Sequence, residues 1–234
     1  VIMCSLEEIA RDNPELIEKY YAKIAKTDAD PMVALNTAYA KDGYFIYVPK
    51  NISIEKPIQL INFLQAKNNT FVTQRNLIVL ESGASAQLIL CDHTLNLNQY
   101  LSNSVTEIFV GANANLDYYT LQNQHNKTTS VNSLFIQQER DSVVSTHTTT
   151  LHGGLIRNNL RIVLNGENAG TNMYGMAFID RKQHIDNSTQ IIHAKPHCES
   201  NQVYKYVLGD ESTGAFSGQI HVDKDAQKTN AFQR

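Results

Sequence analysis

The chain has 234 residues, with 20 basic and 23 acidic side chains and a formal net charge of −3. No stripe of lysine and arginine lies among its aromatic residues, so nucleic acid is not an expected partner. No apolar run approaches the roughly 18 residues that a membrane-spanning helix needs, and no charged-then-apolar leader is present. We expect a soluble, cytoplasmic protein of one main domain, with neither membrane nor nucleic acid as its partner.

The three cysteines are sparse and show no CxxC spacing; they are Cys4, Cys91 and Cys198. An odd number of cysteines without paired spacing argues against a disulfide framework. We therefore expect the fold to depend on packing and hydrogen bonding alone.

The first 43 residues are richer in charge and in helix-start signals than the rest of the chain. Ser5 and Glu8 fit a capping box. Asn13-Pro14 and Asp30-Pro31 each pair an N-cap residue with a proline suited to the first helical position. We predict that residues 1–43 form a small helical segment that covers the exposed end of the β structure following it.

The rest of the chain contains short polar clusters at nearly constant spacing. Steps of 28, 28 and 27 residues separate the markers Gly83, Gly111, Glu139 and Gly166. A further 58 residues, equal to two steps of 29, reach Lys224. A constant period of 20 to 50 residues is typical of stacked units that bury their apolar faces only against their neighbours.

The segments between these clusters predict strands, because they alternate apolar and polar residues and are rich in Val, Ile, Thr and Tyr. The predicted strands are residues 76–80, 86–90, 105–110, 116–121, 133–137, 143–148, 159–164 and 217–222. A unit of 28 residues with two or more strands predicts one coil of a β-helix, since a propeller blade needs four strands and about 40 residues. We predict an all-β core, a β-solenoid, over residues 44–234.

The best candidates for metal ligands are His193, His197 and Cys198, because imidazole and thiolate bind iron and zinc. On a strand, His193 and His197 would share a face that Cys198 does not, and Pro196 would interrupt the ladder. We interpret the three as residues of a turn and its packing. We predict no catalytic, cofactor-binding or metal-binding site in this chain, and these three residues stay weak candidates.

Other histidines are also interpreted as structural. Cys91-Asp92-His93 is placed in a polar break after a strand. His147 and His152 flank a threonine run, in which Thr148 and Thr150 would lie on the face opposite His147 and form a polar ladder.

The C-terminal third carries several ordered motifs, His193–Cys198, Ser200–Lys205, Asp210–Val222 and Ala226–Gln233, with upstream agreement at Ala34–Asn36, Arg75–Leu77 and Gly83–Ala86. In these motifs the chain resembles the SufB/SufD family of the SUF system for iron-sulfur cluster assembly, over nearly its whole length. Ser200-Asn-Gln202 and Phe216-Ser-Gly218 resemble the SufD branch more than the SufB branch.

This resemblance implies a right-handed parallel β-helix and a scaffold subunit of the SufBCD complex without enzymatic turnover of its own. It implies pairing with a SufB-like paralogue and with a SufC-like ABC ATPase. It also implies an iron-sulfur cluster held transiently in the full complex, with none bound by this chain alone. The family's proposed histidine ligand and its ATPase-docking helices lie downstream, so we expect both beyond Arg234 and the family domain to be incomplete here.

Two other functions fit the same fold. A structural β-solenoid could form a homodimer or larger homo-oligomer through its coils. A carbohydrate-active β-helix enzyme would need paired carboxylates and stacking aromatic residues on one face. Tryptophan is absent, and the acidic residues of the β region fall mostly in the turn clusters, so we regard this enzyme as the weaker alternative.

Overall fold

The structure, a computed structural model, describes residues 1–28 and 30–234. In chain order its elements are β1 (Ile2–Ser5), α1 (Leu6–Asp12), α2 (Pro14–Tyr20), α3 (Pro31–Tyr39), β2 (Tyr44–Val48), β3 (Ile58–Leu64), β4 (Thr70–Leu80), β5 (Ser85–Thr94), β6 (Tyr100–Val110), β7 (Asn115–Asn123), β8 (Thr128–Gln138), β9 (Val143–His152), β10 (Leu155–Leu164), β11 (Gly170–Ile179), β12 (His184–His193), β13 (Glu199–Leu208), β14 (Thr213–Val222) and β15 (Asn230–Gln233). Within these described ranges, no helix is long and apolar enough to span a membrane.

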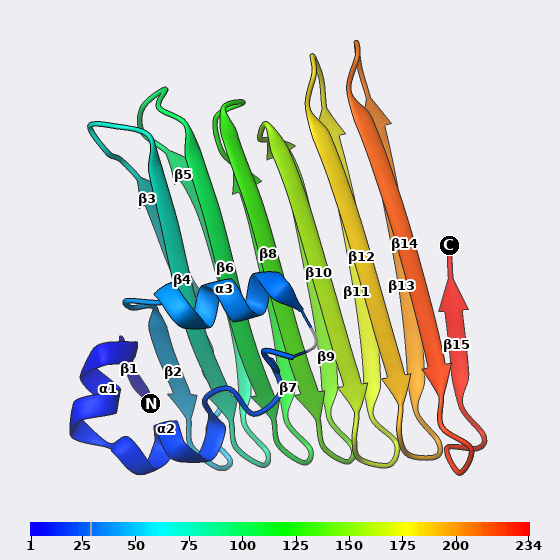
Figure 1. Cartoon of the computed structure of the whole chain (residues 1–234). Helices are drawn as coiled ribbons and strands as arrows, with labels where there is room; N and C mark the ends of the chain where they lie inside the picture. The colour runs from blue at the N-terminus through cyan, green and yellow to red at the C-terminus, as the bar shows by residue number, and fades with distance from the viewer. Residues whose placement is uncertain (29) are drawn as a thin grey trace.

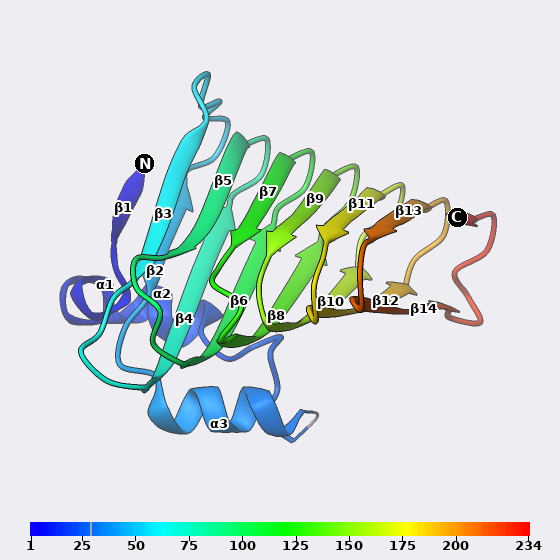
Figure 2. The ribbon, with the colours of Figure 1, turned by 90° about the horizontal axis from the view of Figure 1, so that it is seen from above.

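The strands form two facing sheets, and the chain crosses from one sheet to the other after each strand of the stack (Figures 1 and 2). Sheet A has the order β1-β2-β4-β6-β8-β10-β12-β14, and sheet B has the order β15-β13-β11-β9-β7-β5-β3. Neighbouring strands of the stack are parallel, whereas β1 pairs antiparallel with β2. The predicted parallel β-solenoid is therefore confirmed.

A column of isoleucines fixes the register of sheet A. The Cα pairing connects, one above the other, Ile46, Ile78, Ile108, Ile136, Ile162, Ile191 and Ile220. The first six side chains are buried, and the last packs against the same core. A slip of one residue in any strand would turn its isoleucine to the outer face, so this column specifies the pairing along the whole stack.

The periodic polar clusters are tight turns between sheet A and sheet B. At equivalent positions of five successive turns the backbone is left-handed, with positive φ at Gly83, Asn113, Asp141, Asn168 and His197. Gly, Asn and Asp adopt this conformation at the lowest cost, which explains their recurrence. The sequence markers identified the right turns. The four markers do not all occupy the same position of the turn. Gly83 is itself the left-handed residue, whereas Gly111, Glu139 and Gly166 each lie two residues before it.

The predicted strands all lie within observed strands, but most observed strands are longer. No strand was predicted between residues 170 and 208, where β11, β12 and β13 lie. In these three strands several inward positions carry polar or small side chains, such as Thr171, Asn187 and Gln202, which are buried all the same. The alternation of apolar and polar residues is therefore weak there, although the strands are fully paired.

The N-terminal segment contains all three described helices, and its caps agree in part with the prediction. Ser5 accepts a hydrogen bond from the amide of Glu8 at 3.1 Å, and Asp30 accepts one from Met32 at 2.7 Å, whereas the Asn13 side chain makes no cap bond to its helix. We expected the segment to cover the end of the stack. It extends that edge of sheet A by β1, and α3 also lies across the outer face of the sheet on β4 and β6 (Figure 2).

A buried carboxylate attaches the N-terminal segment to sheet A. Glu107 on β6 accepts hydrogen bonds from the amides of Ala22, Ile24 and Ala25 at 2.8 to 3.0 Å. It also forms an ion pair with Arg75 on β4 at 2.6 Å, with both side chains almost wholly buried. Four donors thus compensate one desolvated charge, which is the condition for keeping an ionised carboxylate in a protein interior.

Arg75 is placed for this role by further contacts on its other side. Its guanidinium donates to Thr37 of α3 at 3.1 Å and lies over the ring of Tyr21, 4.9 Å from the centroid. The pair therefore connects α3, the link after α2 and two strands of sheet A at one point.

Replacing Ile191 with alanine is expected to lower the free energy of unfolding by about 2–5 kcal/mol, because the change opens a cavity in the isoleucine column. Gln190→Ala is the matched control, since Gln190 faces outward on the same strand, and it should change stability by less than about 0.5 kcal/mol. Denaturant unfolding followed by circular dichroism measures both. Equal effects of the two substitutions would contradict the register.

Replacing Glu107 with alanine is expected to destabilise the protein by about 3–5 kcal/mol, because the Arg75 charge stays buried without its partner. Hydrogen exchange should accelerate at the amides of Ala22, Ile24 and Ala25, which lose their acceptor. Glu18→Ala removes an exposed carboxylate of α2 and serves as the control. Unchanged exchange at the three amides in Glu107→Ala would refute the attachment.

Candidate functional site

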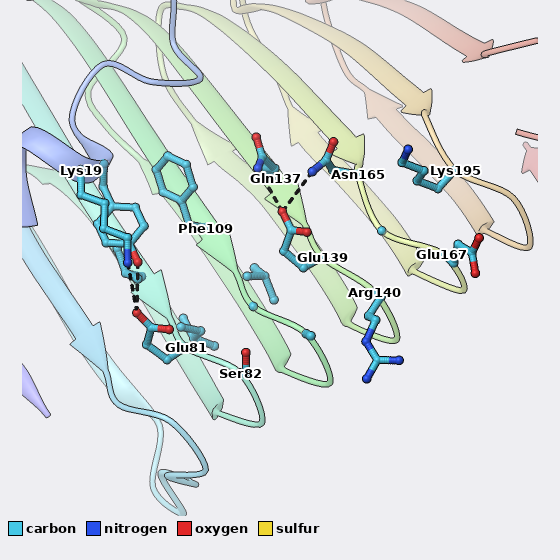
Figure 3. A pocket seen from close by; sticks show the side chains of 17 residues that line it. Lys19, Glu81, Ser82, Phe109, Gln137, Glu139, Arg140, Asn165, Glu167 and Lys195 are labelled. Carbon is cyan, nitrogen blue, oxygen red and sulfur yellow. Dashed lines mark hydrogen bonds and ion pairs between the residues drawn. The ribbon is translucent and has the colours of Figure 1, made fainter. Parts of the chain in front are cut away.

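A pocket of about 710 Å³ lies on the outer face of sheet A, between helix α2 and the ends of five strands (Figure 3). We call it the α2 pocket. Its lining includes Lys19 and Tyr20 of α2, Glu81 after β4, Phe109 on β6, Glu139 after β8 and Lys195 after β12. The volume is within the range of small-molecule sites.

Glu81 at the α2 end of the pocket is already occupied by donors. One of its carboxylate oxygens accepts from the hydroxyls of Tyr20 at 3.0 Å and Tyr47 at 3.3 Å, and the Lys19 ammonium lies 3.9 Å away. Burial raises the pKa of the Tyr20 phenol, so it remains a donor at neutral pH. All three contacts are made to the same oxygen, Oε1, so this carboxylate is paired with a cation and two hydroxyls within the protein itself.

Glu139 in the middle of the pocket is held differently. Its Oε1 atom accepts hydrogen bonds from the side-chain amides of Gln137 and Asn165, both at 3.1 Å (Figure 3). No hydrogen bond of its second oxygen, Oε2, is present among the described residues. The carboxylate is thus fixed in orientation with one oxygen still available.

The sequence did not predict the α2 pocket. Glu139 was recognised as a turn marker, but the pocket is assembled from residues of successive coils and from α2. The spacing of Glu81 and Glu139 by two coils could have placed both carboxylates at one sheet end. The position of α2 beside them depends on the attachment through Glu107, which no local pattern shows.

The weak ligand candidates His193, His197 and Cys198 are not brought together as a ligand set. His193 ends β12 and is fully buried, with Nε2 2.9 Å from the hydroxyl of Ser200. His197 is exposed in the following turn, whereas Cys198 is buried and its thiol lies 3.3 Å from the carbonyl oxygen of Gly166. His193 and His197 do not share a strand face, because the left-handed backbone at residue 197 belongs to the turn between β12 and β13.

The protonation states of these groups follow from burial. Burial lowers the pKa of the His193 imidazole and raises the pKa of the Cys198 thiol, so both are neutral at physiological pH. Neutral imidazole can bind a metal, but a thiol must lose its proton first. Among the residues that the structure describes, no group of three or more His, Cys, Asp or Glu side chains is arranged to hold a metal ion.

Cys91-Asp92-His93 lies inside strand β5 and not in a break after a strand. Asp92 faces the interior and accepts a hydrogen bond from Asn62 at 2.9 Å, and burial raises its pKa. His93 faces outward and stacks on Phe63, with ring centroids 5.9 Å apart. Alternation puts Asp92 on the face opposite Cys91 and His93, so the three side chains do not converge.

His147 and the threonine run agree with the expected alternation. Thr150 is buried and donates to Gln122, whereas His147 lies on the outer face of sheet B. The His147 ring is stacked between Tyr119 at 4.4 Å and Tyr174 at 5.0 Å, and burial lowers its pKa. The expected polar ladder is present on the inner face, and the aromatic stack on the outer face was not predicted.

Large apolar side chains are exposed to solvent on the outer face of sheet B. Examples are Ile61, Phe63, Met176, Phe178, Val207 and Phe232, each with 46 to 58% of its surface accessible. Large exposed apolar side chains gathered on one face are found at sites of protein contact.

Taken together, the described residues define a parallel β-solenoid that presents a pocket and an apolar face but no assembled set of catalytic or metal-binding side chains. The family model for the SufBD core domain of SUF-system FeS cluster assembly matches residues 63–234. The model for the SufBD protein N-terminal region matches residues 1–60. The chain belongs to the SufBD family, as its C-terminal motifs predicted.

Individual relatives agree with this assignment. The iron-sulfur cluster assembly protein SufD of Bacillus subtilis is 28% identical over 249 residues, covering 100% of this chain and 54% of SufD. An iron-sulfur cluster assembly SufBD family protein of Synechocystis is 26% identical, covering 100% of this chain and 50% of the relative. A chloroplastic member from Arabidopsis thaliana is 27% identical, covering 97% and 42%. The chain spans about half the length of these curated relatives.

The buried His193 predicts a pH dependence of stability. Because its pKa is lowered in the folded state, the unfolded chain binds the proton more readily, so stability falls as the pH drops below the ordinary imidazole pKa of about 6.5. The melting temperature of His193→Gln should therefore fall less than that of the wild type between pH 7 and pH 5.5. His221→Gln, at an exposed histidine, should behave like the wild type. If the melting temperature of His193→Gln fell as much as that of the wild type, this explanation would be contradicted.

Proposed function

We propose that this protein is a scaffold subunit of the SUF machinery for iron-sulfur cluster assembly. The observation that carries the proposal is the match of two SufBD family models to residues 1–60 and 63–234, which together cover almost the whole chain. The names of the relatives as iron-sulfur cluster assembly proteins support it.

In this proposal the protein acts in the cytoplasm by binding a SufB-like paralogue and a SufC-like ABC ATPase, and not by catalysis of its own. The separate positions of the weak ligand candidates His193, His197 and Cys198 are compatible with a role without turnover. The exposed apolar face of sheet B supports a role in protein contact.

The iron-sulfur cluster is cargo in this proposal, held transiently by the complete complex and not by this chain alone. His193 and Cys198 do not fit a cluster site as they stand, because both are buried, His193 Nε2 is hydrogen-bonded to Ser200, and the protonated thiol lies against a backbone carbonyl. Ligands supplied by a partner, or by residues outside this chain, would complete such a site.

Co-expression of the full-length protein with its SufB-like and SufC-like partners tests the proposal. A ternary complex, identified by purification and native mass measurement, is the expected result. A stable homo-oligomer that excludes both partners would instead support the structural β-solenoid alternative.

Replacing Cys198 with serine is expected to leave both complex formation and cluster delivery unchanged, since the thiol is buried in the corner of a turn. The measurement is the activity of a cluster-dependent enzyme in cells that rely on the variant. Cys91→Ser, at the other buried cysteine, is the matched control. Loss of cluster delivery in Cys198→Ser alone, at normal protein level, would show that the thiol is a functional ligand.

A further inference from the structure

The α2 pocket has a carboxylate prepared for a cation. Glu139 is oriented by two amide donors on one oxygen, and no ion pair of Glu139 is present within the described ranges. Its neighbour Arg140 is paired instead with Asp141 at 3.3 Å. A fixed carboxylate with an available oxygen is a strong acceptor for a guanidinium or ammonium group.

An aromatic ring lies beside this carboxylate. Phe109 is paired in register with Gln137, the residue whose amide holds Glu139. The ring packs against Tyr20 with centroids 5.0 Å apart and also lines the pocket. A ring next to a carboxylate is the combination that binds organic cations, since the ring attracts the cation and also covers its apolar stem.

Glycine at position 111 allows close packing of the coil that lies between the two carboxylates. Gly111 occupies the coil position between Glu81 and Glu139, as the backbone hydrogen bonds of the three residues show. A Cβ atom there would lie 2.7 Å from the amide nitrogen of Ser82. At the usual strand spacing, the backbone positions of the two glutamates are therefore about 10 Å apart.

The length of the pocket indicates a polypeptide. Its lining extends from β4 to β12, four strand spacings or about 19 Å, which an extended segment of about six residues spans. A small amine would fill one part of this length. Lys195 at the far end forms no ion pair among the described residues and lies about 10 Å, or three extended residues, from Glu139.

We propose that the α2 pocket binds an extended segment of a partner polypeptide, with an arginine or lysine of the segment against Glu139 and Phe109. An acidic residue about three positions away would face Lys195. This proposal does not depend on the scaffold function, because the pocket would accept the same segment chemistry whatever the partner does.

The test uses the full-length protein in cells, with the photo-crosslinking residue p-benzoylphenylalanine replacing Ala112, which lines the pocket. Mass spectrometry of the adduct should identify one segment with a basic residue. Glu139→Lys, and the isosteric Glu139→Gln, should lower the adduct yield by about tenfold or more. Glu55→Lys, at an exposed glutamate outside the pocket, should leave it unchanged. Melting curves confirm that each variant is folded.

A charge exchange completes the test. Replacing the identified basic residue of the partner with glutamate should restore the adduct with Glu139→Lys. The proposal is overturned by an adduct with a small molecule, by a segment without a basic residue, or by the absence of any adduct that depends on Glu139. Co-purification with the SufB-like and SufC-like partners, measured on the same variants, reports on the scaffold function separately.

Discussion

The continuous inward column of isoleucines is the constraint on which the rest of this structure depends. Each coil pairs only with the coil before and after it, so one misplaced side chain would interrupt the stack. The column fixes the register of sheet A, and the register fixes which residue of every turn takes the left-handed backbone. It also aligns Glu81, Gly111 and Glu139 at one end of sheet A. The α2 pocket is therefore a consequence of strand register, completed by a helix from elsewhere in the chain.

Some polar side chains inside this core form hydrogen bonds with one another along the stack. Away from the tight turns, the equivalent inward positions of three strands carry Asn132, Asn158 and Asn187, whose amides bond to one another at 3.0 and 2.9 Å along the axis. Glu107 lies on the outer face of sheet A, where its carboxylate is likewise paired, with three backbone amides and Arg75. Buried polar groups of this kind stabilise a structure only when each has its partners, so they make the attachment of the N-terminal segment specific.

Local chemistry explains what the sequence could predict. Gly83, Asn113 and Asp141 mark turns because few residues tolerate positive φ, and Ser5 and Asp30 mark helix starts because their side chains cap free amides. Strands β11 to β13 escaped prediction because their inward residues are partly polar. The proline at position 196 pointed to the turn that contains His197. The α2 pocket was missed because it joins residues that are far apart in the sequence.

In the proposed function, this protein contributes surfaces for protein contact and not a complete cluster site. The most direct measurement is the iron and acid-labile sulfide content after anaerobic reconstitution, for the full-length protein alone and for its complex with the SufB-like and SufC-like partners. We expect the complex to retain the cluster and the protein alone to lose it. A stoichiometric cluster on the isolated protein that is lost in His193→Ala or Cys198→Ser would contradict it.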